Sequence, residues 1–151
     1  METRHARVPD AAAIRELVNY YAERGRMLHR SLEAVYEMLR EFVVVEEDGR
    51  IVGCVAVDVF WADLAEVKSL AVAEGRRGQG IGRMLAEAAE ADARKLGIKR
   101  LFALTYEDGF FKSRGFVIID RDTLPEKVWR ECIGCPKFDA CDEIAMIKEL
   151  D

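Results

Sequence analysis

The segment EGRRGQGIGRML, residues 74–85, holds the residues whose types and spacing are best suited to chemistry. Glycines alternate with other residues in it, at the start of an amphipathic pattern that predicts a helix over residues 81–96. Glycine lets a ligand approach the backbone closely, and the free N–H groups at a helix N-terminus bind anions. The segment also supplies positive charge from Arg76, Arg77 and Arg83. We therefore expect this loop to bind a pyrophosphate.

Two common phosphate-binding motifs do not match this loop. A dinucleotide fingerprint G-x-G-x-x-G that begins at Gly78 requires a third glycine where the chain has Arg83. A P-loop requires G-K-[ST], and the loop contains no lysine. The pattern that does fit is R-x-x-G-x-G, formed by Arg77, Gly80 and Gly82.

Composition places the chain among globular proteins and limits its partners. Half of its 151 residues are hydrophobic, 34% are charged, and the formal net charge is −5. This negative balance argues against nucleic acid as a partner, because binding to nucleic acid depends on attraction to phosphates. The N-terminal residues lack the apolar core of a signal peptide, and no apolar run is long enough to span a membrane. We expect a cytoplasmic protein without a membrane partner.

The rest of the chain predicts a single α/β domain. Asp10 is the expected N-cap of a first helix that ends at Gly25, and Ser31 is the expected N-cap of a second. Two β-branched runs meet at Asp48-Gly49, the dipeptide most typical of a tight hairpin. Further strands are expected at LAEVKSLAVA, RLFALTY, GFVIID and EIAMIKEL. The predicted order is βααβββαβαβ, then an irregular segment and a last strand, in a sheet of mixed direction.

Three of the predicted helices have an apolar face, which in the first helix is formed by Ile14, Leu17, Val18 and Tyr21. In the helix over residues 81–96, the side chains expected to point inward are those of Ile81, Met84, Leu85, Ala88, Ala89 and Leu96. Glu90 and Arg94 are expected to pair on the outer face of this helix. In the second helix, the residues that share a face are Leu32, Val35, Tyr36 and Leu39.

The loop and its surroundings resemble one protein family. The R-x-x-G-x-G pattern, the strand before it, the helix after it and the later segment FFKSRGF at residues 110–116 are similar to those of the GCN5-related N-acetyltransferases. The resemblance covers essentially the whole chain. It implies one N-acetyltransferase domain over residues 1–151, a mixed, mostly antiparallel central sheet flanked by helices, and acetyl-CoA as the cosubstrate.

The resemblance also implies which residues contact acetyl-CoA. In this family the loop backbone binds the pyrophosphate, and the preceding strand hydrogen-bonds the pantetheine arm. One backbone N–H, here near Leu70, donates to the thioester oxygen and stabilises the negative charge that develops on it. The cofactor-binding residues implied in this way are Leu70, Ala71, Val72, Arg77, Gly78, Gln79, Gly80, Ile81, Gly82, Arg83 and Phe111.

Transfer of an acetyl group to an amine requires a group that removes a proton near neutral pH. In the strand EVKSLAV, side-chain alternation places Glu66, Lys68, Leu70 and Val72 on one face, although a bulge, common in this family, would shift that register. We interpret Glu66, which matches the base position of some family members, as the general base acting through water. We interpret Lys68 as a cation for an acidic substrate. The alternative for both residues is an ion pair at a strand end that faces solvent.

A tyrosine that many family members use as general acid is absent. It lies four residues before the glycine of GF, where this chain has Phe111. Either Tyr106 supplies the proton, or the thiolate leaves unassisted, which is feasible because a thiol has a pKa near 8.5. We favour unassisted departure.

Two further stretches indicate the acceptor. Residues 24–33 and 124–146 resemble the short, single-domain N-acetylglutamate synthases, as does the phenylalanine pair. In that group an arginine before a serine binds a substrate carboxylate, which implies this role for Arg30. Arg30 and Lys68 would then provide two cations for a dicarboxylate. The basic residues expected on the solvated surface nearby are Arg24, Arg26 and His29.

These features predict acetyl transfer to the α-amine of L-glutamate, the first step of arginine synthesis. The alternative acceptor is another small acidic or amide amino acid. The alternative from a different class is a non-catalytic module that binds acetyl-CoA. The expected partners are a small-molecule substrate and a second copy of the chain in a homodimer.

The cysteines have a spacing that leaves three readings open. Cys132, Cys135 and Cys141 form a C-x2-C-x5-C pattern, whereas Cys54 lies within a predicted strand. A structural zinc needs four ligands, and no histidine follows the pattern. We expect structural thiols and no metal, with a metal site or a redox-sensitive pair as the alternatives.

Overall fold

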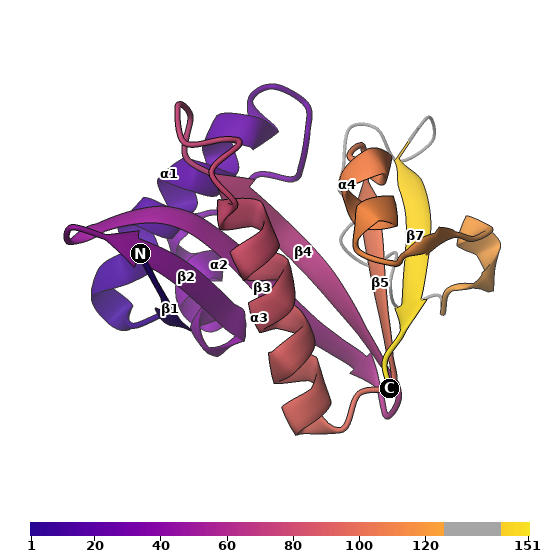
Figure 1. Cartoon of the computed structure of the whole chain (residues 1–151). Coiled ribbons are helices and arrows are strands. Elements are labelled where there is room, and N and C mark those ends of the chain that lie inside the picture. Colours follow the sequence, from indigo (N-terminus) through magenta and orange to yellow (C-terminus); the bar gives the residue numbers. More distant parts are fainter. Residues whose placement is uncertain (126–142) are drawn as a thin grey trace.

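The computed structural model describes residues 1–125 and 143–151 (Figure 1). Its strands form one sheet in the order β1-β2-β3-β4-β5-β7-β6. The strands are β1 (Glu2–His5), β2 (Phe42–Glu47), β3 (Arg50–Trp61), β4 (Leu64–Val72), β5 (Arg100–Thr105), β6 (Val117–Ile118) and β7 (Ile144–Glu149). The α-helices are α1 (Ala11–Ala22), α2 (Leu32–Glu37), α3 (Ile81–Leu96) and α4 (Asp108–Ser113). Short 3-10 helices span Val8–Asp10, Leu39–Glu41 and Arg121–Thr123.

The strand directions confirm the predicted fold class. Only β4 and β5 pair in parallel, and every other neighbouring pair of strands is antiparallel. The order of elements also follows the prediction. The predicted irregular segment and the cysteines at positions 132, 135 and 141 lie outside the described residues.

The sheet is covered on both faces over its first strands. Ile14 and Val18 of α1 belong to a buried cluster on one face, and α3 packs against the other face (Figure 1). Along β2, Val44 belongs to the α1 cluster whereas Val43 belongs to the α3 cluster. This is why FVVV reads as a continuous apolar run, as expected of a strand buried on both faces.

The parallel strands β4 and β5 separate after a short pairing. They pair at Leu64, Ala65 and Glu66 of β4 and then diverge (Figure 1). Just beyond, Ser69 has a φ of 55°, and the register with β3 shifts there. This is a β-bulge, a feature that bends a strand and re-aims its side chains. Divergence and bulge together open the sheet at one end.

Two of the predicted local signals are confirmed. Asp48 and Gly49 have φ values of 52° and 78°, as a type I′ hairpin turn requires. The Ser31 side chain accepts a hydrogen bond from the Ala34 N–H and caps α2.

Asp10 is the N-cap residue of α1, as predicted, but it does not cap the helix with its side chain. Its carboxylate instead accepts hydrogen bonds from the Arg4 guanidinium, at 2.7 and 3.0 Å, and from the Arg7 N–H. The hydrogen bond from Arg4 lowers the pKa of Asp10.

Three residues on the predicted helices lie differently from the prediction. Leu96, the last residue of α3, is 63% exposed, and Tyr36, near the end of α2, is 47% exposed. Glu90 does contact Arg94, at 3.8 Å, but it is buried rather than on the outer face. The α4 and β7 segments cover this part of α3, and helical periodicity cannot reveal such a contact.

Among the described residues, none of the helices has the length and apolarity needed to cross a bilayer.

Candidate active site

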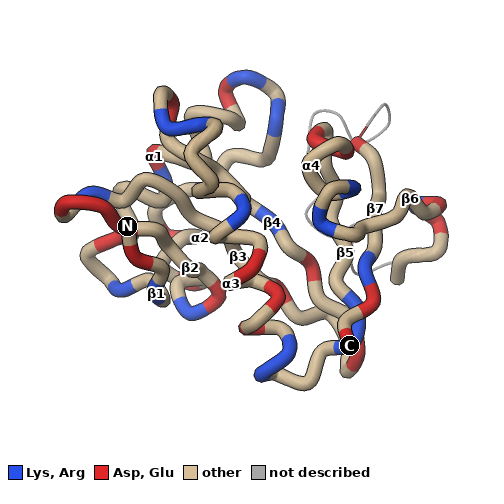
Figure 2. The backbone as a smooth tube through the Cα atoms, in the orientation of Figure 1, with Lys and Arg blue, Asp and Glu red and all other residues tan. Residues whose placement is uncertain are grey.

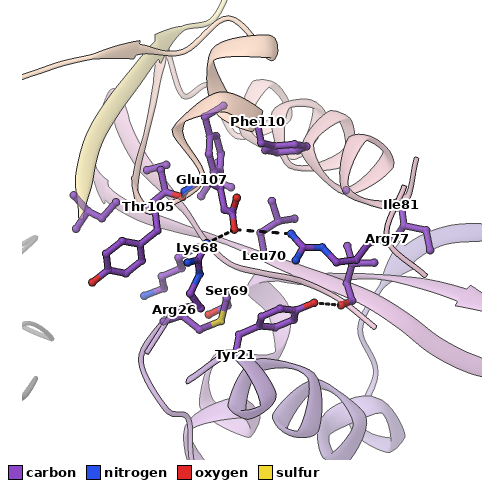
Figure 3. A pocket seen from close by; sticks show the side chains of 18 of the residues that line it. Tyr21, Arg26, Lys68, Ser69, Leu70, Arg77, Ile81, Thr105, Glu107 and Phe110 are labelled. Atoms are coloured by element: carbon purple, nitrogen blue, oxygen red, sulfur yellow. Dashed lines mark hydrogen bonds and ion pairs between the residues drawn. The ribbon is translucent and has the colours of Figure 1, made fainter. Parts of the chain in front are cut away.

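A cavity of about 420 Å³ lies where β4 and β5 separate. Its walls come from the ends of these strands, the α1–α2 loop, the β4–α3 loop and α4 (Figure 3). The predicted site residues that line it are Arg30, Glu66, Lys68, Leu70, Val72, Arg77, Gly78, Gly80, Ile81, Gly82, Arg83 and Phe111. Ala71 and Gln79 do not line it. Ala71 is buried in the α1 cluster, and the Gln79 side chain accepts a hydrogen bond from Arg76.

The glycine loop has the geometry that an anion site requires. Gly78 and Gly80 both have a φ of 82°, and a Cβ at either position would meet no other atom within 4 Å. Glycine adopts this left-handed backbone conformation without strain, and the absence of a side chain leaves open space next to the backbone. Gly80 is the N-cap of α3 and has no side chain to accept hydrogen bonds from the first turn. The first N–H groups of α3 therefore have the arrangement of an anion-binding site.

The arginines around this loop differ in their partners and in their exposure. Arg76 is bound to Glu47 and to Gln79. Arg77 and Arg83 are more exposed, and both line the cavity. Figure 2 shows the basic residues of the β4–α3 and α1–α2 loops at the same end of the molecule. Positive charge is thus concentrated there in a chain of net charge −5.

Glu66 and Lys68 lie at the floor of the cavity, each 8% exposed. The Lys68 ammonium donates to Asp58 of β3 at 2.5 Å. In the register of the sheet, Asp58 lies directly opposite Glu66. Three charged side chains therefore gather at the point where the sheet opens. The predicted ion pair facing solvent does not describe these nearly buried residues.

The predicted common face of the β4 residues is interrupted by the bulge. Leu70 and Val72 pack with the α3 cluster, as Val67 does. Lys68 pairs with Ala56, which belongs to the α1 cluster. The alternation therefore reverses at Ser69, so Glu66, Lys68, Leu70 and Val72 do not share one face; the bulge that we named as able to shift this register is present. All four nonetheless line the cavity, because the strand bends there.

The backbone of Arg30 is held in place by a residue that the sequence did not single out. The Arg30 N–H donates to the Asn19 side-chain oxygen at 2.9 Å, and the Asn19 amide donates to the Arg30 carbonyl at 3.0 Å. Asn19 belongs to α1, so the α1–α2 loop is tied to the helix before it. The signal in the sequence that could have identified Asn19 is its polar side chain next to the apolar residues of the helical pattern.

A carboxylate bridges the two sides of the cavity mouth. Glu107, just after β5, accepts a hydrogen bond from Arg26 at 2.6 Å and lies 3.9 Å from Arg77 (Figure 3). Its N–H donates to the Thr105 hydroxyl. Arg26 also lies 5.6 Å from the centre of the Tyr106 ring. The expectation that Arg26 belongs only to the solvated surface is therefore incomplete, since it lines the cavity.

Aromatic side chains complete the walls. Tyr21 of α1 donates its hydroxyl to the Val72 carbonyl at 2.5 Å, which ties α1 to the end of β4. On the opposite side, Phe111 packs edge to face against Phe110 and Phe116. Phe111 lies beside the cavity without a hydroxyl to donate.

The buried thiol near this region is not a nucleophile. Cys54 of β3 lies beneath the bulge and donates to the Ser69 carbonyl. Burial raises the pKa of its thiol to about 12, so it stays protonated at neutral pH. No group of acidic, histidine or cysteine side chains within residues 1–125 and 143–151 is arranged to hold a metal ion.

Comparison with known proteins identifies the fold and its chemistry. The profile of the acetyltransferase (GNAT) family matches residues 11–116, which include α1, the glycine loop and α4. The chain belongs to the GNAT family. GNAT enzymes transfer an acetyl group from acetyl-CoA to an amine, and the cavity of this GNAT protein is lined by both the glycine loop and the buried carboxylate of Glu66.

The relatives of this GNAT protein include amino-acid acetyltransferases. It is 46% identical to an uncharacterised N-acetyltransferase of Chlorobaculum tepidum, over 97% of this chain and 95% of that protein. It is 37% identical to the amino-acid acetyltransferase of Mycobacterium tuberculosis, over 90% of this chain and 78% of that enzyme.

A solved structure agrees with the fold of this GNAT protein. The N-acetylglutamate synthase of Neisseria gonorrhoeae, crystallised with coenzyme A and N-acetyl-glutamate, superposes with a TM-score of 0.90 at 32% identity. The match covers 99% of this chain but 35% of that enzyme.

Proposed function

We propose that this protein transfers the acetyl group of acetyl-CoA to the α-amine of L-glutamate. The observation that carries the proposal is that the cavity with the glycine loop also contains two cations, Arg30 and Lys68, and a buried carboxylate, Glu66. These groups complement an amine that carries two carboxylates. The amino-acid acetyltransferase and N-acetylglutamate synthase relatives support the same acceptor.

In the proposed reaction, Glu66 removes a proton from the α-ammonium group, directly or through water. The amine nitrogen then attacks the thioester carbonyl carbon, which forms the C–N bond and places negative charge on the carbonyl oxygen. Collapse of this intermediate breaks the C–S bond, and the nitrogen releases its second proton to solvent as the amide forms. Glu66 is 8% exposed and lines the cavity, so its carboxylate lies within reach of an amine bound there.

The backbone supplies the proposed stabilisation of the carbonyl oxygen. Leu70 follows the bulge at Ser69 and lines the cavity, so its N–H is the proposed donor to the negative charge that develops. A donor of this kind typically contributes about 3 kcal/mol to the transition state. Acetyl-CoA supplies the thioester, and the loop from Arg77 to Gly82 binds its pyrophosphate.

The departing thiolate takes up its proton from solvent in this proposal. Phe111 cannot act as an acid, and a thiol with a pKa near 8.5 yields a stable leaving group. Tyr106 lines the same cavity and is the alternative donor.

The experiment that tests the proposal measures thiol release from acetyl-CoA with a panel of amino acids. We expect L-glutamate to give the highest kcat/KM, with glutamine and aspartate lower by about tenfold or more, because each leaves a charge or a distance unmatched. If another amino acid gave the highest kcat/KM, that amino acid and not glutamate would be the acceptor. Binding of acetyl-CoA without transfer to any amine would favour a non-catalytic module.

A further inference from the structure

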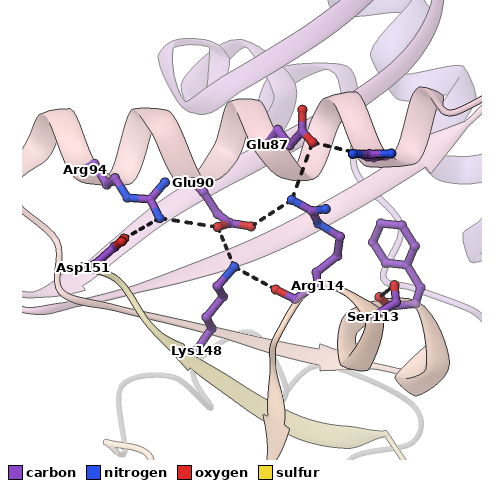
Figure 4. Close-up of polar contacts among 9 residues, drawn as sticks. Glu87, Glu90, Arg94, Ser113, Arg114, Lys148 and Asp151 are labelled. Carbon is purple, nitrogen blue, oxygen red and sulfur yellow. Dashed lines mark hydrogen bonds and ion pairs between the residues drawn. The ribbon is translucent and has the colours of Figure 1, made fainter.

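Glu90 is a buried carboxylate that the proposed reaction does not use. It belongs to α3, is 5% exposed, and points toward α4 and β7 (Figure 4). Lys148 of β7 donates to the Glu90 carboxylate at 2.7 Å and to the Arg114 carbonyl, at the end of α4, also at 2.7 Å. One ammonium group thus connects three separate elements.

The remaining contacts of Glu90 are ionic rather than close hydrogen bonds. Its carboxylate lies 3.7 Å from the Arg114 guanidinium and 3.8 Å from that of Arg94. Within the described residues, the Glu90 Oε2 and Arg114 Nε atoms are buried without a hydrogen-bond partner. A buried carboxylate depends strongly on its cations, so this cluster resists any separation of α3 from α4 and β7.

The same two helices form facing parts of the cavity. At the start of α3, a Cβ on Gly82 would lie 3.4 Å from the ring of Phe110 of α4. Phe110 and Phe111 both line the cavity. The sheet itself joins its two halves through only three paired residues of β4 and β5. The spacing of α3 and α4 therefore depends on side-chain contacts more than on the backbone of the sheet.

We infer that Glu90 is a positioning residue that sets the width of the cavity. Acting through Lys148 and Arg114, it holds α4 against α3 and so fixes the aromatic wall opposite Leu70, where the acyl group of the cosubstrate is expected. Glu90 thereby determines how long an acyl chain fits. The inference rests on the use of acetyl-CoA and not on glutamate as the acceptor.

The test is the preference for acetyl-CoA over propionyl-CoA, measured both as a ratio of kcat/KM and as a ratio of Kd by calorimetry. A fitted apolar pocket distinguishes one methylene by about tenfold or more. In Glu90→Gln, which keeps the side-chain shape but loses the charge, we expect that preference to fall at least severalfold. We also expect kcat to fall by about 10- to 100-fold, since small misplacements reduce turnover to this extent, with the KM of the acceptor unchanged.

Asp10→Asn is the matched control. Asp10 is a similarly buried carboxylate, 7% exposed, bound to Arg4 of β1 at the opposite edge of the sheet. The Asp10→Asn variant should have a lower Tm than wild type but the same preference for acetyl-CoA over propionyl-CoA. Lys148→Met should reduce the acyl preference as Glu90→Gln does. In Glu90→Gln/Lys148→Met, the effects of the two substitutions on this preference should not add.

Several outcomes would overturn the inference. They are a wild type that does not discriminate between the two acyl groups, and a Glu90→Gln protein that loses Tm as the control does but keeps the wild-type preference. If Glu90→Gln does not fold, Glu90→Leu/Lys148→Met removes the carboxylate together with the ammonium group that hydrogen-bonds it, a kind of change that proteins often tolerate. This double variant should also lose the preference for acetyl-CoA. If it kept the wild-type preference, the inference would be overturned as well. The ratio of Kd values for acetyl-CoA and propionyl-CoA is measured without an acceptor. If glutamate is not the acceptor, this shows in the amino-acid panel and leaves the Kd ratio unaffected.

Discussion

Lys68 and Asp58 form an ion pair of 2.5 Å across β4 and β3 at the floor of the cavity. The Lys68 side chain is 7% exposed, whereas that of Asp58 is 28% exposed. A nearly buried ammonium group requires a counter-charge, and Asp58 provides one from the neighbouring strand. Lys68 therefore has a structural partner as well as a proposed substrate, and the two roles can be separated by mutation.

We predict that Lys68→Met raises the KM for glutamate and lowers the Tm, because it leaves Asp58 without this partner. Lys68→Met/Asp58→Asn removes both charges and should recover much of the Tm without recovering the KM. Steady-state kinetics and thermal unfolding of the two variants provide the test. If the double variant regained the wild-type KM, Lys68 would be only structural.

Arg30→Ala is expected to weaken glutamate binding. Loss of a charge-assisted hydrogen bond costs about 1.5–3 kcal/mol, or about 10- to 150-fold in kcat/KM. The effect should appear mainly in KM, since the carboxylate is bound equally in the ground and transition states. The matched control is Arg24→Ala, whose guanidinium stacks 3.5 Å from the Tyr20 ring and does not line the cavity. Equal kinetics for the two variants would remove Arg30 from the substrate site.

Glu66→Gln is expected to lower turnover by about 10²-fold or more at neutral pH, the usual contribution of a general base. The loss should shrink as the pH rises, because the amine then deprotonates without help. Glu66→Asp should retain part of the activity. Calorimetry should give an unchanged affinity for acetyl-CoA in both variants. Wild-type turnover by Glu66→Gln at pH 7 would make this residue structural.

Gly80→Glu should abolish acetyl-CoA binding, because a side chain and a negative charge would occupy the pyrophosphate position. Gly97→Glu is a close control, since Gly97 lies at the other end of α3 with a φ of 84° and no atom within 4 Å of an added Cβ. Both substitutions strain a left-handed backbone, so their effects on Tm should be similar. Only the first should affect binding, as measured by calorimetry. Undiminished affinity in folded Gly80→Glu would overturn the loop assignment.

The ion pair of Asp10 and Arg4 predicts a pH dependence of stability. The guanidinium holds the pKa of Asp10 below its ordinary value near 3.9 in the folded protein. The contribution is therefore complete above that value and is lost as the pH falls through the lower folded pKa. The Tm of Asp10→Asn should be lower than that of wild type at pH 7, and the difference should shrink below pH 4. A difference independent of pH would show that charge is not its cause.

Local signals in the sequence were sufficient for the loop and the order of elements. The glycines before α3 and the Asp48-Gly49 turn require backbone conformations that few other residues adopt, so their identity predicts their geometry. The Ser31 cap depends on contacts within a single turn. The apolar run of β2 likewise follows from burial on both faces. Each of these features leaves a signal within a short stretch of sequence.

The tertiary structure decided what lies opposite each residue. Glu90 resembles a surface residue in the helical pattern, and only the packing of α4 and β7 against α3 buries it among Lys148 and Arg114. Asp58 gained its relationship to Lys68 from the pairing of two strands. Glu107 came to bridge Arg26 and Arg77 because loops distant in sequence meet at one end of the sheet. Periodicity reports which side of an element is apolar, but long-range partners depend on how elements pack, which no local pattern encodes.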